Sequence, residues 1–125
     1  MLDIDYFKAL NDTYGHAAGD RVLAEFAGIL RASLRAGDHI GRVGGEEFAV
    51  LLADRGAEIA TEVAGRIVAA VSATPIALED GRSLSATVSI GVAVAGTADL
   101  EKLLAAADEA LYRSKQAGRN RFEVS

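Results

Sequence analysis

Residues 39–53 read His-Ile-Gly-Arg-Val-Gly-Gly-Glu-Glu-Phe-Ala-Val-Leu-Leu-Ala, and this stretch decides the fold. Two strand-like runs, 39–43 and 47–53, flank Gly44-Gly45, and adjacent glycines are a hairpin signal because both tolerate positive φ. The second run is apolar without alternation, which is typical of a strand covered on both faces. The stretch therefore predicts a hairpin whose second strand lies inside a sheet.

The rest of the chain predicts helices and strands around this hairpin. Apolar residues at helical spacing, with glycine or proline beyond them, favour four helices. They are expected over 5–14, over 20–34, over 57–73 and from Leu100 to just before Gly118. Large and small residues alternate over 87–94, which indicates a strand with one face pressed closely by a helix. The remaining strands are expected over 1–4, over 76–78 and 82–84 as a surface hairpin, and over 122–124 at an edge.

The order of these elements is a split β-α-β-β-α-β pattern with additions. It predicts an α+β fold, an α/β sandwich of the ferredoxin-like or palm type, with a mostly antiparallel central sheet and flanking helices. In that topology the first strand lies between the third and the fourth and is antiparallel to both. Asp3 and Glu46 are therefore expected to converge at one edge of the sheet.

Length and composition exclude several classes of protein. The 125 residues suit one domain, 1–125, and the formal net charge of −5 gives no general electrostatic surface for nucleic acid or an anionic membrane. The absence of cysteine excludes a disulfide framework, and no apolar run is long enough to cross a bilayer. We expect a cytoplasmic protein with no nucleic-acid or membrane partner.

Carboxylates gather where the predicted topology joins the first strand to the hairpin. Asp3 stands in an otherwise apolar strand, and Glu46-Glu47 follow the glycine turn. A divalent cation such as Mg²⁺ would relieve their repulsion, because Mg²⁺ takes one or two carboxylates and keeps positions for water and phosphate oxygens. On the residues alone, solvated carboxylates at strand ends remain the competing interpretation.

The same residues resemble a known family. Residues 44–48 are similar to the GG(D/E)EF signature of diguanylate cyclases, in its GGEEF variant, and residues 3–20 resemble the family's DxDxFKxxNDxxGHxxGD segment. Further matches are Ser89-Ile90-Gly91, Ala107-Asp108, Ala110-Leu111-Tyr112, Lys115 and Gly118-Arg119-Asn120. The resemblance covers nearly the whole chain and implies a nucleotidyl cyclase-like fold.

The resemblance implies a GTP nucleotidyltransferase that condenses two GTP molecules into cyclic di-GMP with release of two pyrophosphates. The domain would act as a homodimer, each partner presenting one GTP. Mg²⁺ or Mn²⁺ would be held by Asp3, the backbone carbonyl of Ile4, and Glu46. The catalytic candidates are Glu46, Glu47 and Lys8, and the sequence leaves open whether a glutamate or metal-bound hydroxide deprotonates the 3′-hydroxyl.

The family also suggests where the substrate binds. Guanine and ribose are expected near Asn11, His16 and Asp20, the phosphates near Phe7, Lys8, Lys115 and Arg119, and the α-phosphate over Gly44 and Gly45. A glycine lets the chain approach a phosphate without a Cβ, and backbone N–H groups at a helix start face an anion favourably. His16 is as well explained by a role in orienting its loop.

A second site is implied upstream of the glycine turn. Arg35-Ala36-Gly37-Asp38 resembles the family's RxxD inhibitory site, which binds the cyclic di-GMP product, and Arg66 matches an arginine that completes this site from a neighbouring domain. Arginine offers a bidentate fork to phosphate or guanine, and aspartate accepts from guanine N–H groups. The alternative interpretation of Arg35 and Asp38 is a cation at a helix end followed by a turn residue.

The chain departs from the family in one respect. Family members carry a helix and an LTGLxNR-type loop before the first strand, whereas this sequence begins at that strand. We expect a domain truncated at its N-terminus, with lower stability or weaker activity, and with room for an upstream sensory domain. The alternative function is a catalytically silent module that binds cyclic di-GMP or GTP as a sensor.

Overall fold

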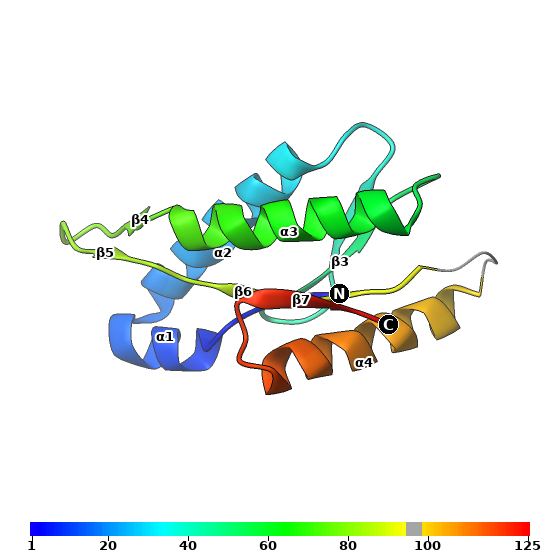
Figure 1. The fold of residues 1–125 in the computed structure, drawn as a ribbon. Helices are drawn as coiled ribbons and strands as arrows, with labels where there is room; N and C mark the ends of the chain where they lie inside the picture. The colour runs from blue at the N-terminus through cyan, green and yellow to red at the C-terminus, as the bar shows by residue number, and fades with distance from the viewer. Residues whose placement is uncertain (95–98) are drawn as a thin grey trace.

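The computed structural model describes residues 1–94 and 99–125 (Figure 1). The helices of this part of the chain are α1 (Phe7–Tyr14), α2 (His16–Ser33), α3 (Ala57–Ala73) and α4 (Leu100–Gln116). Its strands are β1 (Leu2–Ile4), β2 (His39–Arg42), β3 (Glu47–Leu51), β4 (Ile76–Ala77), β5 (Ser83–Leu84), β6 (Val88–Val92) and β7 (Arg121–Val124). None of the helices within the described residues is long and apolar enough to cross a membrane.

The central sheet has five strands in the order β2-β3-β1-β6-β7. Strand β1 runs antiparallel to both β3 and β6, and only β7 adds a parallel pair. The small hairpin β4-β5 forms a separate two-stranded sheet. The structure thus confirms the α+β class, the inner position of the first strand and the C-terminal edge strand.

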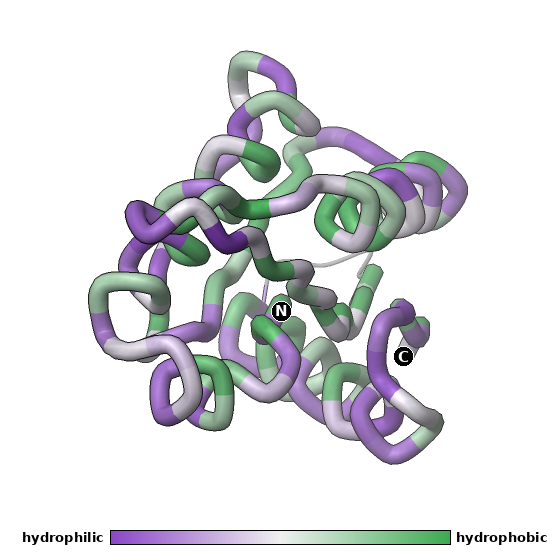
Figure 2. The backbone as a smooth tube through the Cα atoms, turned by 90° about the vertical axis from the view of Figure 1, so that its left-hand side faces the viewer, coloured by the Kyte–Doolittle hydropathy of each residue, from purple (hydrophilic) through white to green (hydrophobic). Residues whose placement is uncertain are grey.

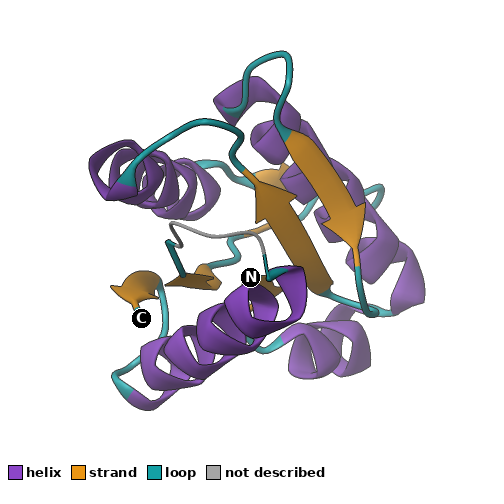
Figure 3. Cartoon of the chain, turned by 90° about the vertical axis from the view of Figure 1, so that its right-hand side faces the viewer, coloured by secondary structure: helices purple, strands orange, loops and turns teal. Residues whose placement is uncertain are grey.

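Helices cover both faces of this sheet (Figures 1 and 3). Helix α4 packs on β6 and β7 from one face, and α3 packs on the same strands from the other, beside α2. In Figure 2 hydrophobic and hydrophilic colours alternate along the helices, as expected of amphipathic helices lying on a sheet. Val22, Phe26 and Leu30 form the buried stripe of α2, and Phe26 meets Phe48 of β3 edge to face at 5.1 Å.

Strand β6 is closely packed between α3 and α4. All of its residues are buried, and a Cβ at Gly91 would collide with the backbone carbonyl of Ala107 and the backbone nitrogen of Leu111 in α4. Ser114 of α4 also donates from its hydroxyl to the Ile90 carbonyl at 2.6 Å. The predicted close approach of a helix to the small residues of this strand is confirmed.

Two helix starts differ from the sequence-based predictions. Helix α1 begins at Phe7 rather than at residue 5, because Tyr6 adopts the left-handed conformation with φ 54° before the helix. Helix α2 begins at His16 rather than at Asp20, because Gly15, with φ 92°, turns the chain within a single residue. The sequence alone allowed Asp5 either to cap this helix or to shape the site from behind its ligands, and the first of these alternatives is wrong because Tyr6 is the N-cap residue.

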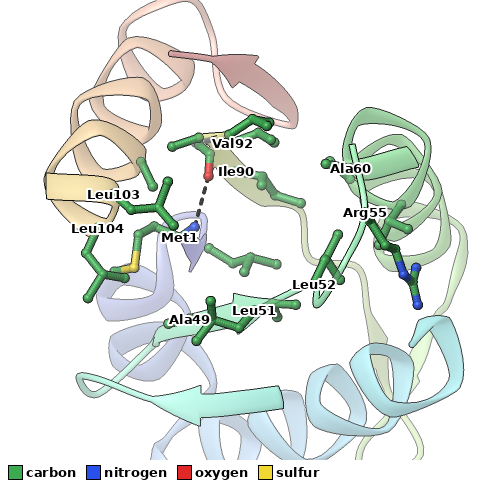
Figure 4. A pocket seen from close by; sticks show the side chains of 18 of the residues that line it. Met1, Ala49, Leu51, Leu52, Arg55, Ala60, Ile90, Val92, Leu103 and Leu104 are labelled. Atoms are coloured by element: carbon green, nitrogen blue, oxygen red, sulfur yellow. Dashed lines mark hydrogen bonds between the residues drawn. The ribbon is translucent and has the colours of Figure 1, made fainter. Parts of the chain in front are cut away.

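The start of β1 lies in a hollow of about 170 Å³ between β3 and β6 (Figure 4). The Met1 ammonium donates to the Gly91 carbonyl at 2.9 Å, and the Gly91 amide donates to the Met1 carbonyl at 2.8 Å. Apolar side chains such as Leu52, Val92 and Leu103 line the hollow from the sheet and from α4. Loss of solvent around the Met1 ammonium lowers its pKa from 8.0 to about 6.

Candidate active site

The end of β1 and the glycine turn meet as the topology predicted. Asp3 is the register partner of Glu47, and the Ile4 amide donates to the Glu46 carbonyl at 3.3 Å. Antiparallel pairing therefore holds the backbone of the predicted metal ligands side by side, with Glu46 half-buried at the turn.

Lys115 is the partner of the buried Asp3 carboxylate. Only 8% of the Asp3 side chain is exposed, and its Oδ2 accepts from the Lys115 ammonium of α4 at 2.5 Å. A carboxylate taken out of water requires a charged or hydrogen-bonding partner. The packing of α4 on the sheet thus brings a predicted phosphate-binding cation to a predicted metal ligand.

Negative charge accumulates around this pair. The pKa of Glu47 is raised, first by partial loss of solvent, then by the Asp3 and Asp108 carboxylates and by Glu46, while Lys115 acts in the opposite direction. Within the described residues no group of three or more acidic or histidine side chains could hold a metal unaided. Two carboxylates and one carbonyl nevertheless suit a cation that keeps water and phosphate oxygens, so this donor set fits a hard divalent ion.

Arg42 fixes the glycine turn. Its guanidinium donates from Nε to the Gly44 carbonyl at 3.2 Å and from Nη2 to the Gly45 carbonyl at 2.7 Å. No atom outside the turn lies within 4 Å of where a Cβ on Gly45 would stand, so the space above this residue is open. These contacts assign Arg42 to holding the turn.

The first turn of α1 lies beside a second cation. Phe7 and Lys8 follow Tyr6, and the Arg119 guanidinium lies 4.5 Å from the Tyr6 ring centre and donates to its hydroxyl at 3.4 Å. Lys8 is exposed. The structure therefore brings Arg119 to the β1–α1 junction together with Lys115.

Asp5 holds this junction together. Its carboxylate accepts from the Thr87 hydroxyl at 2.7 Å, the Ser89 hydroxyl at 2.6 Å and the Asn120 amide at 3.0 Å. It thus links β1 to β6 and to the loop after α4 that carries Arg119. The DxD pattern in the sequence could indicate that Asp5 belongs to the site, but the sequence did not predict its hydrogen-bond partners.

The predicted guanine-binding residues lie where α1 meets α2. The side-chain oxygen of Asn11 is buried and lies against Gly19, the residue before Asp20, and no group in the described part of the chain donates a hydrogen bond to it. His16 and Asp20 are exposed on the first turns of α2. Because buried carbonyl oxygens normally accept a hydrogen bond, Asn11 has capacity for one more donor.

The predicted inhibitory residues are brought together only in part. The Asp38 carboxylate accepts from the Arg35 amide at 3.0 Å, and from Nη2 of Arg55 at 2.5 Å. The Arg35 guanidinium donates to the Ala53 carbonyl at 3.2 Å. Arg66 is exposed on α3, and in the described part of the chain no hydrogen bond or ion pair joins it to either residue. The sequence motif did not identify Arg55.

The sequence is similar to a known family and to named proteins of that family. Residues 1–121 match the family described as "Diguanylate cyclase, GGDEF domain". The chain is 48% identical over 128 residues to diguanylate cyclase A of Treponema denticola, and 48% identical over 126 residues to diguanylate cyclase DgcP of Pseudomonas aeruginosa. It is matched over its full length but spans only 34% and 19% of those two proteins.

Solved structures agree with the fold. The GGDEF domain of DgcB from Caulobacter crescentus, solved with c-di-GMP, superposes with a TM-score of 0.93 at 33% identity over 98% of this chain and 74% of that one. The active GGEEF domain of a diguanylate cyclase from Vibrio cholerae superposes with a TM-score of 0.88 at 34% identity over 98% and 78%. The match of the sequence, of the sheet and of the glycine turn together establish that this chain belongs to the GGDEF domain family of diguanylate cyclases.

Proposed function

We propose that this domain condenses two GTP molecules into cyclic di-GMP. The 3′-hydroxyl of each GTP attacks the α-phosphate of the other, and two pyrophosphates leave. The supporting observation is the meeting of Asp3, the glycine turn and Lys115 at the end of β1. Because each domain presents one GTP, the reaction requires a homodimer.

Divalent metal use is general in this family, and Mg²⁺ or Mn²⁺ is the cofactor proposed here. Asp3, the Ile4 carbonyl and Glu46 would hold it. When bound, it supplies neutralisation of the charge on the phosphate oxygens. The raised pKa of Glu47 has loss of solvent as its largest cause, and the Asp3, Asp108 and Glu46 carboxylates add to it. Their contribution supports the same assignment, because neighbouring carboxylates favour a cation between them.

The chain's own cations position the triphosphate. Lys115 exchanges its Asp3 partner for a phosphate oxygen, while Arg119 and Lys8 approach from the β1–α1 junction. The free N–H groups of Phe7 and Lys8 at the start of α1 add favourable backbone donors. Phosphoryl transfer requires mainly in-line placement and charge neutralisation, which these groups supply.

Proton transfer and base recognition use the remaining residues. Glu46 or Glu47 accepts the 3′-hydroxyl proton, and the raised pKa of Glu47 brings it nearer the range of an effective general base. The unpartnered oxygen of Asn11 accepts from a guanine N–H, and Asp20 accepts from another. His16 supports the same pocket from the start of α2.

Product inhibition is assigned to Arg35 and Asp38, with Arg66 contributed by a neighbouring domain. This assignment rests on the RxxD resemblance and on the proximity of the two residues, whose backbone amide and carboxylate are joined at 3.0 Å. Cyclic di-GMP is therefore both the product and an inhibitor, and an upstream sensory domain is the expected source of activation.

The deciding experiment incubates the purified chain with GTP and Mg²⁺ and measures cyclic di-GMP by liquid chromatography. Product is expected, at a rate that rises more steeply than linearly with protein concentration while dimers are scarce. Glu46→Ala is expected to abolish product and keep a cooperative unfolding transition. Glu79→Ala, which alters an exposed residue between β4 and β5, is the matched control and keeps activity.

Two outcomes would contradict the proposal. Unchanged turnover in Glu46→Ala would overturn the metal assignment. Binding of GTP or cyclic di-GMP by the unaltered chain, without product at any protein concentration, would favour the catalytically silent sensor instead.

A further inference from the structure

The carboxylate of Asp38 is closed off from solvent by an arginine outside the RxxD motif. Only 1% of the Asp38 side chain and 9% of the Arg55 side chain are exposed, and Nη2 of Arg55 lies 2.5 Å from Oδ2 of Asp38. Asp38 belongs to the turn between α2 and β2, and Arg55 to the connection between β3 and α3. Figure 4 shows the Arg55 side chain directed away from the neighbouring hollow.

This ion pair leaves hydrogen-bonding capacity unused. Oδ1 of Asp38 and Nε of Arg55 are both buried, and among the described residues neither atom has a hydrogen-bond partner. Buried polar atoms in folded proteins are nearly always paired, and an unpaired one destabilises the state that contains it. The closed arrangement is therefore one that a ligand offering a donor to Oδ1 can replace.

The connection between β3 and α3 contacts both Arg35 and Asp38, the two named residues of the RxxD motif. Ala53 accepts from the Arg35 guanidinium at 3.2 Å, while Arg55 binds Asp38. Between them Asp54 adopts the left-handed conformation, with φ 55°, which is disfavoured for residues with a Cβ. Residues 53–55 thus form one short, strained segment that fixes Arg35 and Asp38 together.

We propose that Arg55 is a latch on the inhibitory site, which cyclic di-GMP must displace before its guanine can reach Asp38. This inference rests on the inhibitory role proposed for Arg35 and Asp38. Two N–H groups on one edge of guanine donate to the two oxygens of a carboxylate, but Oδ2 is held by Arg55 and the whole carboxylate is covered. Displacement frees both oxygens.

The effect of removing Arg55 distinguishes a latch that opposes cyclic di-GMP from an arginine that contacts it. Arg55→Gln removes the charge that holds Asp38, so cyclic di-GMP is expected to inhibit at about a tenfold lower concentration, which corresponds to about 1.4 kcal/mol. An arginine that only added a contact to the ligand would give weaker inhibition when removed. Arg55→Lys keeps the charge but loses the planar fork and is expected to shift inhibition in the same direction by less.

Two measurements test this on the chain as it stands. Half-inhibitory concentrations are taken from initial rates of GTP turnover, and the dissociation constant of cyclic di-GMP is taken by calorimetry with a non-hydrolysable GTP analogue filling the active site. The matched control is Arg82→Gln, which makes the same charge change in the exposed Arg82–Asp80 pair of the β4-β5 hairpin and leaves both values unchanged.

The outcomes separate this inference from the proposed function. If Arg35→Ala relieves inhibition while Arg55→Gln leaves it unchanged or weakened, the latch is wrong and the inhibitory site stands. If Arg35→Ala leaves inhibition intact, or the unaltered chain shows none, the inhibitory assignment fails and the latch fails with it. Should Arg55→Gln not fold, Arg55→Lys decides, and an unchanged dissociation constant in that variant overturns the latch.

Discussion

Asp5 shows how one buried carboxylate joins distant segments of a candidate site. Its three donors come from Thr87, Ser89 and Asn120, which lie 82, 84 and 115 residues further along the chain. These bonds join the strand that carries Asp3 to the loop that carries Arg119. Asp5 thus fixes the proposed metal ligand Asp3 and the proposed phosphate-binding cation Arg119 relative to each other.

Replacing this carboxylate tests that role. We expect Asp5→Asn to lower the free energy of unfolding by about 2–3 kcal/mol, because an amide cannot accept all three charge-assisted hydrogen bonds. Urea denaturation measures the change. Asp12→Asn, at an exposed position on α1, is the control and is expected to stay within about 0.5 kcal/mol. Equal stability of the two variants would show that the Asp5 bonds do not hold the junction.

The motif identified Asp5 as a member of the site, either as a helix cap or as a residue that shapes the site, but not its hydrogen-bond partners. Helix caps act on residues two or three positions away, which is the range that sequence reading tests most easily. The partners of Asp5 are brought to it only when β6 and the end of α4 have docked on β1. The contact of Arg55 could not be predicted for the same reason: its partner Asp38 lies 17 residues away and is brought close only when the hairpin has formed.

At the scale of elements, the contact of α4 with β6 determines where Lys115 stands. Gly91 permits this contact, since any Cβ there would overlap the backbone of α4. Backbone atoms cannot move aside as a flexible side chain can. Helix α4 would have to shift away from the sheet, and Lys115 would move with it.

Gly91→Ala is therefore expected to lower the free energy of unfolding by about 3 kcal/mol and to reduce cyclic di-GMP formation together with it. Gly28→Ala is the matched control, because Gly28 lies inside α2 with nothing within 4 Å of its added Cβ. Helix propensity predicts that this control gains about 0.5–1 kcal/mol. Denaturation midpoints that coincide for the two variants would contradict the close packing of α4.

Periodicity predicted the elements better than their boundaries. The apolar stripes of α2, α3 and α4 follow from spacing alone, because one face of each helix lies on the sheet. The predicted start of α2 was wrong because Gly15 was taken as a stop followed by a loop. The predicted start of α1 was wrong because the left-handed conformation of Tyr6 delays that helix to Phe7. A single residue at φ 92° is enough to join two helices, and the alanines after His16 extend the second one backwards.

At the scale of the whole molecule, the site forms because distant segments share one sheet. The pairing of Asp3 with the glycine turn could be predicted, since strand order alone fixes it. The Lys115–Asp3 bond could not, because it depends on how α4 lies on β6. Family resemblance supplied Lys115 as a candidate, and packing explains why it lies at Asp3, a proposed metal ligand.

Burial of the Met1 ammonium makes the stability of this 125-residue chain depend on pH. Burial lowers the pKa of this group from 8.0 to about 6, against the opposing attraction of Asp108 and Glu47. Between those values the unfolded chain binds more protons than the folded one, so the free energy of unfolding rises with pH. The expected rise from pH 6 to pH 8 is about 2 kcal/mol, which is less than two full pKa units at about 1.4 kcal/mol each, because the amine is half protonated at each of its two pKa values.

Acetylation of the Met1 amine isolates this contribution. It removes the charge, while both histidines and every carboxylate remain, and the hollow beside Met1 has room for the acetyl group. Urea denaturation of the two forms at pH 6, 7 and 8 should therefore give a slope with pH for the free amine that exceeds the slope of the acetylated chain. Parallel slopes would mean that the ammonium stays solvated, and that the start of β1 does not lie between β3 and β6 as the Met1–Gly91 bonds require.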